Sequence, residues 1–446
     1  MSNSLRHPKI VIIGAGMTGI LMAIKCREKG IQDIVVLEKA GRIGGTWREN
    51  TYPGVACDVP AHMYTYSFAM NPDWSRYYAG GSEIQGYFEA MVQRYNLEPL
   101  IHCNEEVTAS EFNNGQWLIS TSAGRQYQAD FVFCATGILH HPAYPDIKGL
   151  ASFKGKVFHT ARWNHDVTFD PSVSVGVIGN GSTAAQFIPE LVKTGAQVSV
   201  FMRTPQWIVR IPDRSIMAWE RFLLKHSVLM QRLYRWASTL LIRDFFNKAL
   251  AGAPIRAWLL DKLVRLNLRF SVKDKDLRDQ LTPDFQVGCK RVIVNTTFYT
   301  AMQQGNAHLV RDGIAEVTPD GLLMNDGTLH QCDVLVLSTG FKALSYMRPM
   351  ALVGDNNVAI DEAWKDKIEA YHSVLLKDYP NFFLMLGPHT PIANFSVIAM
   401  SEVQGDYIMQ LIDAWMLGDF DTVAPQQEAV DRYQQFIRDG LKGSTW

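Results

Sequence analysis

The stretch that decides the fold is Lys9–Glu38, KIVIIGAGMTGILMAIKCREKGIQDIVVLE. A short apolar run, Lys9–Ile13, predicts a buried strand, and it leads through the glycine-rich turn Gly14–Gly19 into a helical pattern. A second apolar run, Ile34–Leu37, ends at the acidic residue Glu38. Strand, glycine turn, helix and strand in this order predict a βαβ unit, and therefore an α/β fold with a parallel sheet.

The turn of this unit has the pattern GxGxxG, with Gly14, Gly16 and Gly19 at the fixed positions. Glycines there allow a tight turn and let the backbone approach a pyrophosphate at the N-terminus of the helix. Glu38 stands where an acid accepts a hydrogen bond from a ribose hydroxyl. A glycine-rich turn in an unrelated sheet protein is the alternative, but it would not require the acid. The unit is therefore predicted to bind a dinucleotide.

A second βαβ unit follows, with strand Val173–Ile178, turn Gly179–Ala184, helix Ala185–Lys193 and strand Val198–Met202 ending at Arg203. Alanine replaces the third glycine of its turn, which the motif allows. The residues that we expect to contact a second nucleotide here are Gly179, Gly181, Ser182, Thr183, Arg203 and Thr204.

Glu38 and Arg203 occupy the same position in the two units, 24 residues after Gly14 and Gly179 respectively. An acid at this position binds a free 2′-hydroxyl and would repel a 2′-phosphate, whereas an arginine suits the 2′-phosphate of NADP. The first unit is therefore predicted to hold FAD and the second NADPH. The alternative for Arg203 is a solvated cation at the end of a strand.

The segment that follows the first unit, GGTWRENTYPGVACD (residues 44–58), is interpreted as the floor of the flavin site. Gly44 and Gly45 leave room for a flat cofactor, and Pro53-Gly54 forces a turn. Two later predicted strands end in small residues, at Ala135-Thr136-Gly137 and at Thr339-Gly340, and small residues allow the backbone to approach a nucleotide closely. From these three segments the predicted cofactor-binding residues are Gly45, Thr46, Trp47, Asp58, Ala135, Thr136, Gly137, Thr339 and Gly340.

The composition fits a folded globular protein of two or three domains, because the 446 residues are 47% hydrophobic and 20% charged. A net charge of −1 argues against a nucleic-acid-binding protein. The six cysteines form no CxxC pair and no spacing typical of metal ligands, so they are interpreted as reduced thiols and a disulfide reductase is disfavoured. We expect a cytoplasmic protein, since neither a secretory signal nor a membrane-spanning apolar run is visible.

Residues 214–275 differ from the rest, with 13 Lys and Arg against 4 Asp and Glu. Apolar residues recur there at helical spacing, including Phe222, Leu223, Leu229, Leu233, Trp236, Leu240 and Leu241. One interpretation is a pair of helices on a membrane surface. The other is a helical subdomain whose apolar face covers the active site.

The organisation expected from all these patterns is two Rossmann-like dinucleotide-binding domains with a helical insertion. The expected FAD-binding parts are 1–145 and 341–446, the NADP-binding parts 146–212 and 277–340, and the insertion 213–276.

The sequence resembles class B flavoprotein monooxygenases, and more narrowly type I Baeyer–Villiger monooxygenases. Residues 44–58 match the family pattern [AG]GxWxxxx[FY]PGxxxD at every fixed position. Residues 153–163 match FxGxxxHxxxW through Phe153, Gly155, His159 and Trp163. Finally, Lys290-Arg291 falls where the family carries its pair of active-site cations.

This resemblance implies that NADPH reduces FAD, that dioxygen adds at the flavin C4a carbon, and that the resulting peroxyflavin anion attacks a ketone to give an ester or lactone. Arg291 would stabilise that anion, because a guanidinium cannot lose its proton at neutral pH. Asp58 would pair with Arg291, and Lys290 would help to hold the 2′-phosphate of NADP. His159 and Trp163 would hold the connection between the domains, with hinges near 140–150 and 338–345.

Two alternatives stay open at this point: an N- or S-oxygenating flavin monooxygenase, and an FAD- and NADP-binding redox sensor or NADPH oxidase that forms no oxygenated product. The expected partners are a ketone and dioxygen. The expected assembly is a monomer or a small homo-oligomer, with a possible peripheral membrane contact through 214–275.

Overall fold

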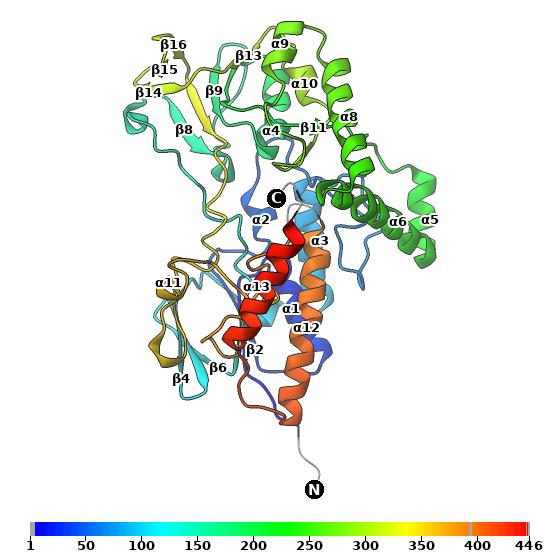
Figure 1. Ribbon diagram of the computed structural model, residues 1–446, viewed down its shortest axis with the longest axis vertical. Helices are drawn as coiled ribbons and strands as arrows, with labels where there is room; N and C mark the ends of the chain where they lie inside the picture. Colours follow the sequence, from blue (N-terminus) through cyan, green and yellow to red (C-terminus); the bar gives the residue numbers. More distant parts are fainter. Residues whose placement is uncertain (1–4, 392–394, 443, 445–446) are drawn as a thin grey trace.

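The computed structural model describes residues 5–391, 395–442 and 444, and Figure 1 shows two α/β units stacked along the long axis of the molecule. The first unit is built on a five-stranded sheet in the order β19-β7-β1-β2-β3, and every pair of neighbouring strands is parallel. Its strands are β1 (Ile10–Ile13), β2 (Ile34–Glu38), β3 (Ile101–Cys103), β7 (Phe131–Cys134) and β19 (Phe382–Leu384).

The second unit repeats the same arrangement, with strand order β13-β10-β9-β17-β8 and parallel pairing throughout. In each sheet the first strand of the βαβ unit is central, and its second strand lies beside it. The strands are β8 (Lys156–His159), β9 (Ser174–Ile178), β10 (Gln197–Phe201), β13 (Ala307–Val310) and β17 (Val334–Leu337). The predicted α/β class and both predicted βαβ units are therefore confirmed.

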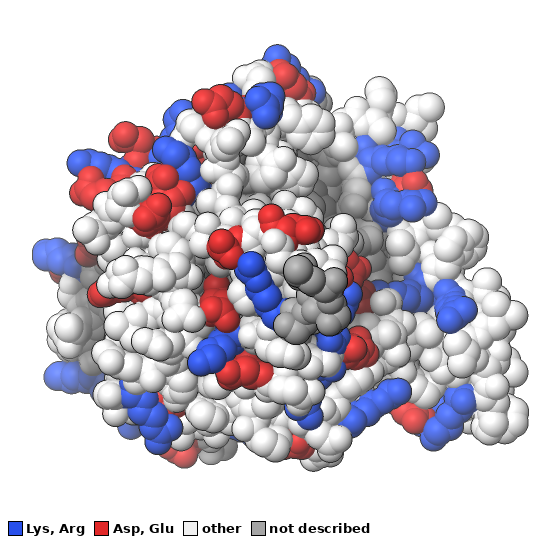
Figure 2. All heavy atoms as spheres, turned by 90° about the horizontal axis from the view of Figure 1, so that it is seen from below, with Lys and Arg blue, Asp and Glu red and all other residues white. Residues whose placement is uncertain are grey.

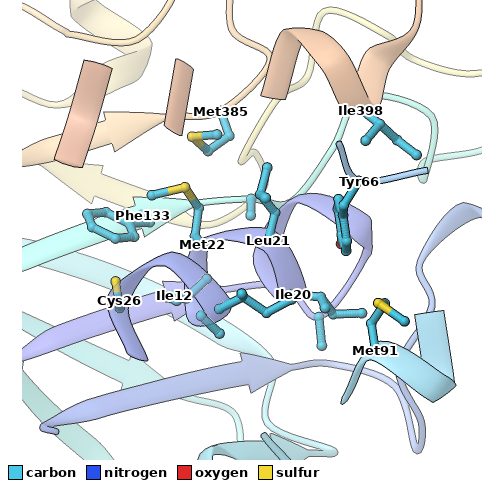
Figure 3. Close-up of a cluster of buried hydrophobic side chains, with 14 of the residues drawn as sticks. Ile12, Ile20, Leu21, Met22, Cys26, Tyr66, Met91, Phe133, Met385 and Ile398 are labelled. Carbon is cyan, nitrogen blue, oxygen red and sulfur yellow. The ribbon is translucent and has the colours of Figure 1, made fainter. Parts of the chain in front are cut away.

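Helix α1 (Met17–Glu28) is buried on almost every side, which explains why its sequence is apolar all round. It packs between the first sheet and α12 (Val397–Leu417), and Figure 3 shows Ile20, Leu21 and Met22 of this helix among side chains from several other elements. Ion pairs Lys25–Asp406 and Lys29–Asp413 flank the contact between the two helices. The equivalent helix of the second unit, α4 (Ser182–Lys193), lies at the centre of the second core.

Smaller elements complete both units. A mixed sheet joins β4 (Val107–Asn113), β5 (Gln116–Thr121), β6 (Gln126–Ala129) and β18 (Ala351–Val353). An antiparallel sheet joins β14 (Ile314–Thr318), β15 (Gly321–Met324) and β16 (Leu329–Gln331), and β11 (Ile208–Val209) pairs in parallel with β12 (Ile293–Val294). The remaining short or covering helices are α2 (Thr46–Glu49), α3 (Gly81–Arg94), α10 (Phe298–Ala301), α11 (Ile360–Ala363) and α13 (Gln427–Leu441).

The basic segment forms a helical projection, visible at the right and top of Figure 1. It contains α5 (Ala218–His226), α6 (Val228–Leu240), the π-helical stretch η4 (Leu241–Asn247), α7 (Lys248–Leu250), α8 (Pro254–Ser271) and α9 (Lys275–Gln280). Within the described parts of the chain, none of the helices combines the length and the apolar character needed to cross a bilayer.

The interpretation that the apolar face of this segment covers the active site is wrong for the residues on which it was based. Phe222, Leu229 and Trp236 are 62%, 66% and 61% exposed, and Leu223, Leu233 and Leu241 are exposed as well. A different face is buried, since Leu260, Val264 and Leu268 of α8 pack into the second core. Amphipathic spacing showed that the helices have an apolar face, but it did not show what lies against it.

Two connecting segments lie side by side where the chain passes from one unit to the other. The first follows β7 and the second follows β17. Pro142 forms an antiparallel bridge with Phe341, and the amide of Lys342 donates to the carbonyl of His141 over 2.9 Å. These segments coincide with the predicted hinges. The domain boundaries themselves stay a prediction.

We predict that Gly19→Ala lowers the melting temperature of the protein clearly. A Cβ atom at Gly19 would lie 1.9 Å from the carbonyl oxygen of Gly14, so the turn between β1 and α1 would have to shift, at a cost of about 3 kcal/mol. Gly86→Ala on the exposed side of α3 is the matched control, because nothing lies within 4 Å of its added Cβ. It should stabilise the helix by about 0.5–1 kcal/mol. Equal melting temperatures for the two variants would contradict this account of the turn.

Candidate active site

A cavity of about 470 Å³ extends from the first unit to the second, a size typical of sites for small molecules. Its walls combine the β1–α1 turn, the end of β2, the segment 44–58, the end of β7 and the N-terminus of α4. Among the predicted site residues, those that line it are Gly14, Gly16, Glu38, Gly45, Thr46, Trp47, Asp58, Ala135, Thr136, Gly137, Ser182 and Arg291. The structure therefore brings together residues from three predicted segments and both βαβ units.

The β1–α1 turn forms a cradle that only glycine fits. Gly14 has φ +101°, and a Cβ there would lie 2.7 Å from the carbonyl oxygen of Ala135. The backbones of Gly16 and Gly45 approach so closely that a Cβ on Gly45 would lie 3.1 Å from the Gly16 Cα. Gly16 is also the N-cap of α1, and no side chain caps this helix end. The first amide groups of α1 are therefore available to an anion.

Glu38 is buried at the end of β2 and its carboxylate already has three partners. It accepts hydrogen bonds from the amides of Ala15 (2.8 Å) and Ala40 (3.0 Å), and it pairs with Arg48 at 2.8 Å. A carboxylate has about four acceptor positions, so one is left for a hydroxyl donor. The partner Arg48 was not predicted, and its role is to hold the acid in place.

Two further buried carboxylates on the cavity wall lack partners. Glu49 Oε2 and Glu105 Oε2 have no hydrogen-bond partner among the described residues, although the other oxygen of each pairs with an arginine. Buried polar atoms are normally satisfied, so these oxygens indicate a bound group rich in donors. A flavin adenine dinucleotide, with its hydroxyl and amino groups, fits this wall. The sequence held no signal for either residue, because neither stands at a fixed position of a recognisable motif.

The segment after Tyr52 is fixed against α4 of the second unit. The hydroxyl of Tyr52 donates to Gln186 Oε1 over 2.8 Å, and Gln186 Nε2 donates to the carbonyl of Ala56 over 2.9 Å. Gly54, at φ +79°, passes so close to α4 that a Cβ would lie 2.8 Å from the carbonyl oxygen of Gln186. The glycine of the PGxxxD pattern is thus required by contact with the other unit. Gln186 was missed because an isolated glutamine in a helix carries no sequence signal.

Asp58 and Arg291 form an ion pair on the wall of the cavity, with 2.6 Å between Oδ2 and Nη2. Asp58 belongs to the segment fixed against α4, whereas Arg291 directly precedes the short strand β12 of the second unit. The pairing expected from the family resemblance is confirmed. Arg291 keeps 42% of its side chain exposed and Asp58 keeps 20%, so water reaches the pair in this conformation.

The second glycine turn repeats the geometry of the first. Gly179 has φ +109°, and a Cβ there would lie 2.3 Å from the carbonyl oxygen of Ser338. Gly181 caps α4 without a side chain, as Gly16 does for α1, and Ser182 and Thr183 begin the helix. The amide groups at this helix end are therefore available in the same way.

Three basic or polar residues near this turn were predicted to hold a 2′-phosphate. The exposed side chain of Arg203 has no hydrogen bond or ion pair with any residue in the described ranges. The carbonyl of Thr204 accepts a hydrogen bond from Asn180, and Lys290 lies over the ring of Phe285 at 4.6 Å. Arg203 is thus free to take an anion, and the grouping of Lys290 with it stays a prediction.

Thr339 and Gly340 were predicted to contact a nucleotide, but the structure places their hydrogen bonds at the connecting segments. Thr339 Oγ1 donates to the carbonyl of Ala143 over 2.6 Å, and the carbonyl of Gly340 accepts from the amide of Ala143. Their contact with a cofactor stays a prediction.

The FxGxxxHxxxW motif leads into the second sheet instead of lying only between the units. Gly155 permits this path, since a Cβ there would lie 2.2 Å from the carbonyl oxygen of Asp333 and would also clash with the ring of Phe153. His159 ends β8 and is buried, and its ring contacts one aromatic side chain on each connecting segment, Tyr144 at 5.6 Å and Phe341 at 5.8 Å. Burial lowers the pKa of His159, which favours a neutral ring. Trp163 packs in the second core.

Comparisons with known proteins agree with this geometry. Residues 11–233 match the family of pyridine nucleotide-disulphide oxidoreductases. A Baeyer–Villiger monooxygenase of Streptomyces coelicolor is 36% identical over 99% of this chain and 85% of its own length.

Two crystal structures extend the likeness to the whole fold. The open form of cyclohexanone monooxygenase has a TM-score of 0.88 at 26% identity, covering 98% of this chain and 94% of its own. A complex of the protein OTEMO with FAD and NADP has a TM-score of 0.87 at 26% identity, covering 99% and 92% of the two chains. The sequence motifs, the paired Rossmann-like units and the relatives at full length lead to one conclusion: the chain belongs to the Baeyer–Villiger monooxygenase family.

Proposed function

We propose that this protein uses FAD, NADPH and dioxygen to insert one oxygen atom beside a ketone carbonyl, giving an ester or a lactone. The observation that supports this most strongly is the Asp58–Arg291 pair on the wall of the cavity that both units share. When bound, the two cofactors supply the hydride and the activation of dioxygen. The protein binds and orients the reactants, holds a fixed charge beside them and limits access of water.

FAD would be held by the first unit. The amides at the start of α1 and the cradle of Gly14, Gly16 and Gly45 would take its pyrophosphate, and Glu38 would use its remaining acceptor position for a ribose hydroxyl. Gly19 would keep the turn close to β1. The remaining wall would be made by Thr46, Trp47, Ala135, Thr136 and Gly137.

NADPH would be held by the second unit, through the amides at Gly181, Ser182 and Thr183 and through the free guanidinium of Arg203. In the same proposal, NADPH also contacts Thr204, Lys290, Thr339 and Gly340. The carboxylate of Glu38 at the equivalent position of the first unit would repel a 2′-phosphate there. This difference in charge supports the proposal that the first unit holds FAD and the second holds NADPH.

Arg291 would stabilise negative charge that develops on oxygen during the transfer. A guanidinium keeps its proton at any pH at which the protein is folded, and a fixed charge costs no reorganisation during the reaction. Asp58 holds this side chain by a charge-assisted hydrogen bond at 2.6 Å. The cavity around the pair is largely apolar, with Met17, Val59, Leu386 and Val397 on its wall, which favours an apolar ketone.

We predict that Arg291→Ala abolishes ester formation while NADPH still reduces the bound flavin. Loss of one such charge typically lowers the rate by about 100-fold to 1,000-fold. Flavin bleaching under nitrogen and ester yield by mass spectrometry, with cyclohexanone, an acyclic methyl ketone and an aryl sulfide as substrates, separate the two steps. Lys290→Ala is the neighbouring control and should keep the ester yield at saturating NADPH. An unchanged ester yield in Arg291→Ala would reject the role of this residue, and oxygenation of the sulfide alone would reject the ketone assignment.

Arg203→Ala should raise the KM for NADPH by about tenfold or more and leave the KM for NADH nearly unchanged, because only NADPH carries the phosphate that the guanidinium binds. Lys156→Ala serves as the control, since Lys156 is also exposed but lies on the edge strand β8, which two strands separate from β10. Steady-state NADPH and NADH titrations give both constants. If the two constants shift alike, the 2′-phosphate assignment is wrong.

His159 and Trp163 would couple the two units during the reaction. Because His159 contacts both connecting segments and Arg291 is half exposed here, we propose that the segments near 140–150 and 338–345 act as hinges that close the cavity against water.

His159→Ala should therefore release more hydrogen peroxide per NADPH consumed, with FAD content and flavin reduction nearly unchanged. The ratio of hydrogen peroxide to ester reports how well the cavity closes. A purely structural role of His159 would leave this ratio unchanged. His308→Ala, an exposed histidine on the edge strand β13, is the control. An unchanged ratio in His159→Ala would reject this coupling.

A further inference from the structure

The outer surface of the helical insertion, residues 214–275, exposes far more large apolar side chains than a solvent-facing surface needs. Six of them, on α6 and α8, are 44% to 76% exposed: Leu229, Leu233, Trp236, Ile255, Trp258 and Phe270. On α6 the first three are spaced by four and three residues, so they form one stripe. Exposed apolar residues that share one helix face in this way mark an interaction site.

The charges around these stripes are mostly positive, and several of them have no acidic partner. All four acids of residues 214–275 are already engaged, in the pairs Arg214–Glu220, Arg243–Asp244 and Arg265–Asp261 and in the cap that Asp274 makes for α9. Six cations have no acidic partner in the described part of the chain: Arg221, Arg232, Arg256, Lys262, Arg269 and Lys273. The right-hand lobe of Figure 2, where α5 and α6 lie, is mostly white with several blue patches. Apolar stripes bordered by unpaired cations therefore characterise this surface.

We infer that this surface docks on an anionic membrane, with Leu233, Trp236 and their neighbours inserted at the level of the head groups and the cations facing the lipid phosphates. Amphipathic helices with aromatic residues on one side and Lys or Arg beside them bind bilayers in this way. Lys262 lies 5.9 Å over the ring of Trp258, which puts a cation directly beside an apolar anchor. The contact is peripheral, because no helix of the described chain could span a bilayer.

The inner side of the same helices leads to the wall of the cavity. Arg235 of α6 donates to the carbonyl of Thr65 over 2.9 Å and pairs with Glu402 of α12 at 3.3 Å. Tyr64 and Val397, next to these contacts, line the cavity. The segments that α6 contacts on its inner side therefore also carry residues of the cavity wall. Resting on the proposed function, the substrate class is an apolar ketone that partitions into lipid and enters from the membrane side.

Sedimentation with vesicles tests the docking without any substrate. The full chain, loaded with FAD, is incubated with vesicles of phosphatidylcholine alone or of phosphatidylcholine mixed with phosphatidylglycerol. We expect binding to the anionic vesicles that weakens as salt is raised. The double variant Leu233→Ser/Trp236→Ser and the double variant Arg232→Glu/Arg269→Glu should each lower the partition coefficient by about tenfold or more.

Phe436→Ser is the matched control, because Phe436 is 69% exposed but lies on α13, outside the insertion. It should bind vesicles like the unchanged protein. Failure of the protein to bind anionic vesicles, or equal binding by all variants, would overturn the proposal. So would a dimer in analytical ultracentrifugation that the insertion variants abolish while vesicle binding is absent, since a second copy would then cover the surface. Loss of ester formation would not affect these outcomes, so failure of the docking and failure of the proposed function can be told apart.

Discussion

The structure depends on close contact between the segment 52–58 of the first unit and α4 of the second. Gly54 allows this contact, and the two hydrogen bonds of Gln186 fix it on either side of the turn. Asp58 leaves this segment toward Arg291, so the ion pair exists only because the two units are held at this distance. A side chain at Gly54 would separate the carboxylate from the guanidinium, although neither of these groups touches that glycine.

Glycine also permits close approach at the two glycine-rich turns. The lack of a side chain there leaves room for a ligand. Gly14 and Gly179 have nearly the same backbone conformation, and each lies against a carbonyl at the end of a neighbouring strand, that of Ala135 or of Ser338. What distinguishes the two units is charge at one position, an acid with three partners in the first and an arginine without a partner in the second. The fold therefore supplies two equivalent cradles, and in our proposal these single side chains determine which nucleotide each one favours.

The helical insertion has two faces with different roles. Its inner face is held by Arg235, a guanidinium whose pKa is lowered by burial and which reaches backbone carbonyls and Glu402. Its outer face carries apolar stripes and unpaired cations. Because the two faces point in opposite directions, one element can be anchored to the body of the protein and still present a surface to a partner.

Sequence alone determined the two βαβ units, the acid and arginine that distinguish them, and the motifs that identify the family, because each depends on local spacing. Its resemblance to Baeyer–Villiger monooxygenases also indicated that Asp58 pairs with Arg291. It could not find Gln186, Glu49 or Glu105, since these residues acquire importance only by packing against segments far away in the chain. Nor could it show that the apolar face of residues 214–275 points outward. Helical periodicity defines which side chains share a face, whereas tertiary packing decides whether that face meets the core, the cavity or the exterior.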